Sequence, residues 1–544
     1  MIRLRNSTCR PALARPIGAV LAGLALWTAF PPLNWWPAAV AGVAGVVVTI
    51  RGSSLRRGAG LGLLAGLGMW VPTVSFLQPF GLDAWAAVAL IESLWFAGLG
   101  VAVVLVGRLR WWPLASALVW VGQEFLRDRW PFDGFPWARL AFGQADGPVV
   151  RLAALGGAPL VSFAVALAGG LVAYAVVRGG LRRGRPALLA LAAVALVVLA
   201  PLGIRLPTAG TSRDGAPSSA VIATVQGNVP RLGLEEFAQR YAVTEDHLNE
   251  TRALARDVAT GALPAPQIVI WPENASDQDP RTDPVARAQI DAASAAVGVP
   301  MLIGAVIDGP GPNHVQNAAI VWSPQTGPGQ MYLKRHLVPF GEYLPFRSVL
   351  TKLFSEFSLI PKDFVPGHRP GTLQVGPVRV ADAICFEVAD DAVVRQAVTG
   401  GGRIIVVQTN NASYEHKGDS GHGGETAQQL AISRLRAIES GRAVVVDATS
   451  GVSAMIAPNG RVLAQTGVFV PGLLDMRLPL RDPLTVADRI GPWPEWVLSI
   501  AALVALALAL SQNRVQRRRT RLDLDSRVID AELGQADLRV RGSG

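Results

Sequence analysis

The stretch ADAICFEVAD, residues 381–390, closes the β-rich run VRVADAICF (378–386) and contains Cys385. Cys385 is one of two cysteines in 544 residues, and the acidic residue Glu387 follows it two positions later. A lone cysteine at the end of a strand is a small core residue, half of a disulfide, or a nucleophile. The segments on either side of this stretch decide among the three.

Around Cys385 the chain alternates between short β-rich runs and helical stretches, from residue 218 to residue 480. Such alternation predicts an α/β domain whose sheets are covered by helices. The expected strands are 220–229, 267–271, 300–308, 317–322, 378–386, 403–409 and 443–449, and the expected helices are 234–260, 284–297, 390–399 and 425–440.

The rest of the chain is apolar. Half of all residues are hydrophobic and the mean hydropathy is +0.34, which is typical of a membrane protein. Since about 20 residues cross a bilayer, we expect about eight spans, with the first, second and fifth rather short. The runs are 17–30, 36–50, 60–80, 84–107, 111–125, 153–177, 187–204 and 494–510.

These runs predict four regions. Residues 1–207 form an N-terminal membrane domain of about seven helices, 218–480 the α/β domain, 490–512 a C-terminal transmembrane helix, and 513–544 a basic tail expected to be disordered. The net charge of +10 is carried by arginine clusters between apolar runs, which favours membrane topology over nucleic-acid binding.

The arginine clusters also predict the orientation. Every second connection between apolar runs is basic, which places both termini in the cytoplasm and the α/β domain outside it. The loop 126–151 is an exception, because it should lie outside yet carries Arg127, Arg129 and Arg139. With this topology Cys9 and Cys385 lie on opposite sides of the membrane and cannot form a disulfide within one chain.

A nucleophilic cysteine needs a base and a source of positive potential, because the thiolate is the reactive form. IVIWPEN (268–274) places Glu273 after one β-rich run, and MYLKRHLVPFGEYLP (331–345) places Lys334 after another. Taken alone, a carboxylate after a strand is usually a solvated cap, and a lysine in that position is usually a surface charge. Together they predict one site, in which Lys334 lowers the pKa of Cys385 and stabilises an oxyanion while Glu273 moves the proton.

IVIWPEN, YLKRHLVPFGEYLPF and AICFE resemble the three catalytic stretches of the nitrilase, or carbon–nitrogen hydrolase, superfamily. The resemblance implies a four-layer αββα sandwich and a catalytic triad of Glu273, Lys334 and Cys385. The membrane spans, together with GFPWARLAFGQADGP (134–148), resemble the apolipoprotein N-acyltransferase family. The chain departs from that family at Phe386, where many members have Tyr, and near Gln428 and Gln429, where a His is usual.

This resemblance implies transfer of an acyl chain from a phospholipid to the α-amine of an apolipoprotein's N-terminal diacylglyceryl-cysteine, through a Cys385 thioester. It also implies a monomer in the inner (cytoplasmic) membrane of a bacterium, with the lipid bilayer as a partner. We expect no cofactor and no nucleic-acid partner, and no metal because the six histidines show no metal-ligand spacing.

Further residues are expected to support the site. Glu342 could orient Lys334, and Glu387 belongs either to the site or to a structural salt bridge. Phe386, Trp271 and Asn274 are expected to shape the site.

Four residues are candidates for contact with substrate or lipid: Trp137, Arg139, Tyr343 and Phe346. Arg139 would meet a lipid phosphate or pair with Asp146. The segment 343–361 is either a lid or membrane-dipping arm, or an ordinary amphipathic surface helix. Glu92, inside a span, is either functional or a packed, protonated side chain.

Two other functions remain open on the residues alone. A membrane-tethered amidase acting on a small C–N substrate would share the triad, although a soluble substrate needs no platform of about eight spans. A transporter or scaffold with a degenerate outer domain would explain the spans but not an intact Glu-Lys-Cys set.

Overall fold

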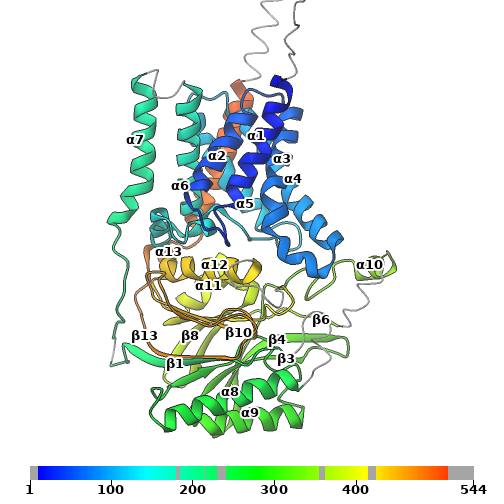
Figure 1. The fold of residues 1–544 in the computed structure, drawn as a ribbon, viewed down its shortest axis with the longest axis vertical. Coiled ribbons are helices and arrows are strands. Elements are labelled where there is room, and N and C mark those ends of the chain that lie inside the picture. Colours follow the sequence, from blue (N-terminus) through cyan, green and yellow to red (C-terminus); the bar gives the residue numbers. More distant parts are fainter. Residues whose placement is uncertain are drawn as a thin grey trace, which may run out of the picture.

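The computed structural model describes residues 10–178, 184–212, 215–229, 241–353, 362–414 and 424–512. A bundle of helices stands on an α/β body, and the C-terminal helix Trp493–Gln512 returns into the bundle (Figure 1). The bundle helices are α1 (Arg10–Trp27), α2 (Pro37–Ile50), α3 (Leu55–Thr73), α4 (Leu82–Val106), α5 (Trp112–Arg127), α6 (Ala153–Val177) and α7 (Arg185–Leu199).

Four helical stretches are long and apolar enough to cross a membrane: Leu82–Val106, Pro148–Val177, Arg185–Gly203 and Trp493–Gln512. They correspond to the fourth, sixth, seventh and eighth expected spans. Shorter apolar helices, Leu13–Trp27 and Pro37–Ile50, occupy the first two expected positions. The total of about eight spans therefore stays a prediction.

Small residues allow the bundle helices to approach closely. A Cβ atom added to Gly62 of α3 would lie 2.1 Å from the Phe96 carbonyl oxygen of α4, and one added to Gly100 of α4 would lie 2.2 Å from the Gly58 oxygen of α3. Such backbone contact is typical of helices that pack in a membrane, where burial of apolar surface does not drive association.

The α/β body contains two sheets. The first has the order β13-β1-β2-β3-β4-β5 with β6 paired to β4, and the second has the order β12-β11-β10-β9-β8-β7. At the centre of each, three strands run parallel. The strands are β1 (Ser219–Gln226), β2 (Ile268–Ile270), β3 (Met301–Asp308), β4 (His314–Ser323), β5 (Gly327–Leu333), β6 (Asp363–Phe364), β7 (Thr372–Val375), β8 (Val378–Ile384), β9 (Ile404–Thr409), β10 (Val444–Ala448), β11 (Ala454–Ile456), β12 (Val462–Gln465) and β13 (Gly472–Pro479).

Each predicted β-rich run coincides with a strand. Several strands of the structure are not among the predicted runs, including the edge strands β5, β7, β12 and β13. An edge strand is partly solvated and so carries polar, Gly and Pro residues, as in GPGQMYL of β5, which weakens the apolar pattern.

Helices cover both outer faces and complete an αββα sandwich (Figure 1). The pair α8 (Ala242–Ala259) and α9 (Pro284–Val297) covers the first sheet, and α11 (Asp391–Thr399) and α12 (Gly424–Ser440) cover the second. The two sheets pack against each other through one apolar core that includes Ile222, Ile270, Val380, Ile404 and Val445. The helix expected at 234–260 begins at Ala242, and residues 230–240 lie outside the described part of the chain.

The second sheet's helices also face the bundle. One hydrophobic cluster runs without a break from Leu140 and Phe142, which follow α5, to Val393 of α11 and Leu435 of α12. The α/β body is therefore packed onto the bundle through a shared core as well as joined to it by the chain.

Candidate active site

Three strand ends bring the predicted triad together. Glu273 follows β2, Lys334 follows β5 and Cys385 follows β8, and all three side chains are buried. The Lys334 Nζ lies 3.1 Å from Glu273 Oε1 and 2.9 Å from Glu342 Oε1. The expected orienting contact between Glu342 and Lys334 is therefore present in the structure.

Two asparagines hold the Glu273 carboxylate. The Asn317 Nδ2 donates to Glu273 Oε1 at 2.6 Å, and the Asn410 backbone N–H donates to Oε2 at 2.8 Å. Neither residue is predicted from the sequence. Asn410 directly follows β9, which is the same strand-end position that indicates Glu273, whereas Asn317 lies inside β4 and gives no such signal.

The Cys385 thiol lies in a strained turn. Its backbone φ is +54°, a conformation that residues other than glycine rarely adopt and that is often found at functional sites. The Gln429 Nε2 lies 3.7 Å from Sγ, and Thr409 also forms a hydrogen bond with the thiol. These two neighbours, like the asparagines, come from segments distant in sequence.

The electrostatics of the thiol differ from the prediction. Burial and the Glu273 carboxylate raise the pKa of Cys385 well above its usual value, and Lys334 offsets them only in part. For Lys334, burial lowers the pKa, but Glu273 and Glu342 together hold it well above its usual value. Lys334 does lower the pKa of Cys385, as expected, but burial of the thiol and the Glu273 carboxylate outweigh it, so the net shift is upward. The arrangement is a protonated thiol beside a charged lysine.

Glu387 fastens the turn that carries the nucleophile. One oxygen accepts from the backbone N–H groups of Arg335 and His336, at 2.7 and 3.0 Å, and the other from that of Ile384 at 2.8 Å. The Tyr332 hydroxyl donates to both oxygens, at 2.8 and 2.9 Å. These contacts connect the start of the Cys385 turn to the segment that follows Lys334, so Glu387 positions two members of the predicted triad.

Phe386 joins the same turn to the loop after α5. Its ring is stacked on Trp137 and Phe135, each with a centroid distance of 5.8 Å, and His336 meets it edge-on at 5.2 Å. The Trp137 Nε1 donates to Gln428 Oε1 at 2.7 Å and is buried. Trp137 therefore belongs to an aromatic wall behind the nucleophile.

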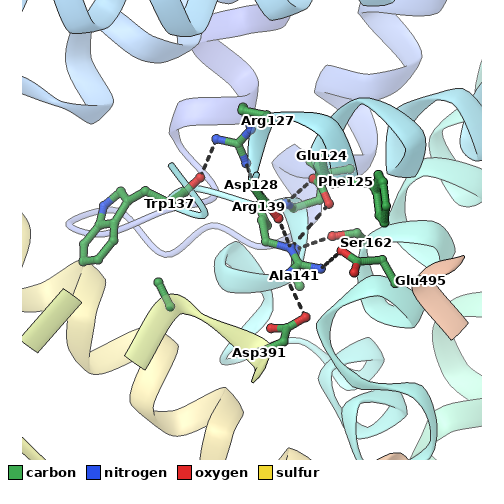
Figure 2. A network of polar contacts seen from close by, with 12 residues as sticks. Glu124, Phe125, Arg127, Asp128, Trp137, Arg139, Ala141, Ser162, Asp391 and Glu495 are labelled. Carbon is green, nitrogen blue, oxygen red and sulfur yellow. Dashed lines mark hydrogen bonds and ion pairs between the residues drawn. The ribbon is translucent and has the colours of Figure 1, made fainter. Parts of the chain in front are cut away.

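Arg139 does not have the predicted partners. Its guanidinium is 2 % exposed and lies among four carboxylates (Figure 2). Asp146 instead pairs with Arg434, at 2.7 Å. The prediction that Arg139 meets a lipid phosphate or Asp146 is wrong, because its charge is already balanced inside the protein. The four contacts are with Glu124 at 3.8 Å, Asp128 at 3.3 Å, Asp391 at 2.9 Å and Glu495 at 3.7 Å.

This cluster connects three parts of the chain. Asp128 directly follows α5, Asp391 begins α11, and Glu495 lies in the C-terminal helix. Burial raises the pKa of Asp391, yet Arg139 and Arg436 hold it well below its usual value. At the bundle side, Arg127 lies 3.5 Å from Glu92 of α4, so this buried acid has an ionic partner.

Trp271 and Asn274, the other residues expected to shape the site, lie on either side of Glu273 in the chain and support its position. Trp271 is fully buried, and its Nε1 donates to Thr251 on α8 at 2.9 Å, so it supports the strand end from behind. Asn274 has a φ of +54°, which turns the chain directly after Glu273.

Tyr343 is partly buried and Phe346 is 71 % exposed, with its ring 6.0 Å from that of Phe132. They precede the short helix α10 (Arg347–Leu353). Phe354, Phe357 and Leu359 of the predicted arm lie outside the described residues. The arm therefore stays a prediction.

A buried Glu-Lys-Cys arrangement at the strand ends of an αββα sandwich defines a class of enzyme. Residues 222–482 match the family model described as carbon-nitrogen hydrolase, and residues 22–171 match the model described as the apolipoprotein N-acyltransferase N-terminal domain. The chain is thus an enzyme of the carbon–nitrogen hydrolase superfamily with an attached membrane domain.

Relatives refine this class. A protein of Mycolicibacterium smegmatis named apolipoprotein N-acyltransferase is 40 % identical over 535 residues, which cover 94 % of this chain and 88 % of that protein. A protein of the same name from Pseudomonas putida is 30 % identical, covering 93 % and 99 %. One from Vibrio parahaemolyticus is 26 % identical, covering 92 % and 97 %. The chain belongs to the apolipoprotein N-acyltransferase family.

Proposed function

We propose that this protein transfers a fatty acyl chain from a phospholipid, through a thioester on Cys385, to the α-amine of the N-terminal diacylglyceryl-cysteine of apolipoproteins. The observation that carries the proposal is the buried Cys385 thiol, whose turn is packed against a loop of the membrane bundle and faces Lys334 and Glu273. The names of the relatives support the acceptor. The position of the thiol at a membrane bundle supports a lipid donor.

The proposal includes a topology. About eight spans hold the protein in the inner membrane of a bacterium, with both termini in the cytoplasm and the α/β domain outside. The membrane domain is 1–207, the catalytic domain 218–480, the last helix 490–512 and the cytoplasmic tail 513–544, and the protein acts as a monomer. The arginine clusters between apolar runs support this orientation.

In the first step, Glu273 takes the thiol proton as Sγ attacks the ester carbonyl carbon of the phospholipid. The Lys334 ammonium and the Phe386 backbone N–H donate to the oxyanion that forms, and such a donor is worth about 10²–10³ in rate. The carbon–oxygen ester bond then breaks, and the proton on Glu273 passes to the leaving alkoxide. A lysophospholipid departs and a Cys385 thioester remains.

In the second step, the apolipoprotein amine attacks the thioester carbonyl as Glu273 accepts a proton from nitrogen. The carbon–sulfur bond breaks, and that proton returns to sulfur to restore the thiol. A thioester reacts with amines more readily than an oxygen ester, so the cysteine converts a poor acyl donor into a good one.

The resting state suits this scheme. A thiol whose pKa is raised stays protonated and stores its proton until Glu273 removes it, while Lys334 remains charged for the oxyanion. The aromatic rings of Phe135, Trp137 and Phe386 form an apolar wall beside the turn, which disfavours water that would hydrolyse a thioester.

The test is intact mass spectrometry of the purified full chain after incubation with a phospholipid. We expect an added acyl mass on the wild type, its absence from Cys385→Ala, and its loss on addition of a diacylated lipopeptide together with acylation of that peptide's amine. Release of free fatty acid without transfer to the amine would refute the proposal in favour of a hydrolase, such as a membrane-tethered amidase.

A further inference from the structure

A cavity lies at the junction of the bundle and the α/β body. Its volume is about 1060 Å³. It is lined by the 3₁₀ segment Pro148–Leu152, by Leu202–Leu206 beyond the end of α7, by Arg434 of α12 and by the turn between β11 and β12. None of the predicted triad residues lines it, so it is separate from the candidate active site.

The lining of this cavity is strongly basic. It contains four arginines and one carboxylate, Asp146, which is paired with Arg434 at 2.7 Å. Within the described ranges of the chain, no carboxylate lies at ion-pairing distance from Arg151, Arg205 or Arg461. Arg205 and Arg461 are exposed. Uncompensated arginines that converge from separate segments provide charge-assisted donors for a phosphate or a carboxylate.

The cavity lies where apolar helices end. Trp36 precedes the first residue of α2, the candidate span Pro148–Val177 begins at the cavity, and the candidate span Arg185–Gly203 ends two residues before Arg205. Tryptophan and arginine at the end of a span are typical of the layer in which lipid headgroups lie. The cavity is therefore at the depth of a bilayer surface.

An apolar surface continues from the cavity along α7. The helix lies at the edge of the bundle beside α6 (Figure 1), and its leucines are turned outward. This surface suits acyl chains, whereas the arginines suit an anion. The most exposed leucines are Leu188, Leu189, Leu196 and Leu199 of α7 and Leu202 just beyond it, which are 51 to 70 % exposed.

We propose that this cavity binds the phosphate headgroup of an anionic phospholipid, whose acyl chains lie along α7. Arg151 and Arg205 belong to the membrane domain, whereas Arg434 and Arg461 belong to the α/β body. One headgroup therefore contacts both parts and ties them together. The Arg151 guanidinium already donates to the carbonyl oxygens of Leu202 and Ile204, at 2.8 and 3.1 Å, which holds the end of α7 at the cavity.

The test compares the full-length wild type with Arg205→Gln/Arg461→Gln in detergent. Native mass spectrometry measures retained lipid, and thermal unfolding measures stabilisation, with phosphatidylglycerol, phosphatidylcholine or inorganic phosphate added. We expect the wild type to retain and be stabilised by phosphatidylglycerol, and the variant to retain it about tenfold less, since each basic residue contributes to anionic-lipid binding. Inorganic phosphate and phosphatidylcholine should stabilise neither protein.

Two further variants distinguish binding of the headgroup in the cavity from a general effect of lowering the positive surface charge. Arg252→Gln/Arg477→Gln removes two exposed arginines elsewhere on the surface and should behave as the wild type. Arg205→Lys/Arg461→Lys keeps the charge and should recover most of the retention. Equal retention by Arg205→Gln/Arg461→Gln and the wild type would overturn the proposal. So would equal retention of phosphatidylcholine, or the same stabilisation by inorganic phosphate, which would indicate a site for a free anion.

Discussion

Arg139 is the residue whose removal tests the docking of the two parts most directly. Its guanidinium balances Asp128 of the loop after α5, Asp391 of α11 and Glu495 of the C-terminal helix (Figure 2). Arg139→Met keeps much of the side-chain volume but removes the charge. The carboxylates then face one another in a buried site. We expect this substitution to loosen the catalytic domain from the bundle.

The size of the effect follows from burial. Arg139 is 2 % exposed, so its ion pairs are not screened by solvent. Breaking a buried pair by removing one partner costs about 3–5 kcal/mol, because it leaves an uncompensated charge. At about 2–4 °C per kcal/mol for a domain of this size, the unfolding temperature should fall by about 10 °C.

Thermal unfolding of the purified full chain in detergent measures this change. The matched control is Arg287→Met, because Arg287 pairs with Asp291 at 3.1 Å and both side chains are exposed, by 39 % and 48 %. An exposed pair is worth about 0–1 kcal/mol, so the control should shift the unfolding temperature by about 2 °C or less.

A double variant checks the cause. In Arg139→Met/Asp391→Asn the carboxylate that lies nearest to Arg139, at 2.9 Å, is neutral, so the loss should be smaller than the sum of the two single losses. An unfolding temperature of Arg139→Met within about 2 °C of the wild-type value would refute the role of Arg139 in docking. So would a loss in the double variant equal to the sum of the two single losses.

Three other predictions concern the predicted triad and Glu387, which positions it. Lys334→Met should slow acylation of Cys385 by about 10²–10³ in single-turnover mass spectrometry, because an oxyanion donor is lost, and a rate within tenfold of the wild type would contradict that role. Glu387→Gln should lower the free energy of unfolding by about 2–3 kcal/mol, because three backbone N–H groups at the Cys385 turn and after Lys334 lose a charged acceptor. Tyr332→Phe removes only the hydroxyl that donates to the same carboxylate and should cost about 1 kcal/mol. Equal losses in the two variants would contradict the positioning role of Glu387. Because the pKa of Cys385 is raised, thiolate forms only at high pH, so alkylation of the wild type by iodoacetamide should still accelerate above about pH 8.5, and a plateau below that pH would refute the assignment.

Local pattern was sufficient to predict the central strands of both sheets, most of the helices and the three residues of the predicted triad. Hydropathy located the apolar helices, and strand-helix alternation predicted the sandwich, since both depend on residues adjacent in the chain. Glu273, Lys334 and Cys385 were recognised because each directly follows a β-rich run, and strand ends present side chains at a common edge. The edge strand β5 was visible only as the β-like run before Lys334, because its Gly and Pro residues break the pattern.

Contacts between distant segments were decided by the tertiary structure alone. Arg139 and Asp391 are 252 residues apart, so no local signal could show that the arginine is neutralised inside the protein. The same holds for Asn317 at the Glu273 carboxylate and for Gln429 at the thiol.

The net direction of the Cys385 pKa depended on burial and on how two carboxylates share one lysine. Residue types by themselves indicated the opposite direction. The sequence determined which chemical groups this protein carries and on which elements they lie, because those depend on short-range periodicity. Only the fold decided which charges balance one another, because Coulomb interactions depend on distance and solvent exposure, which arise only when segments far apart in the chain pack together.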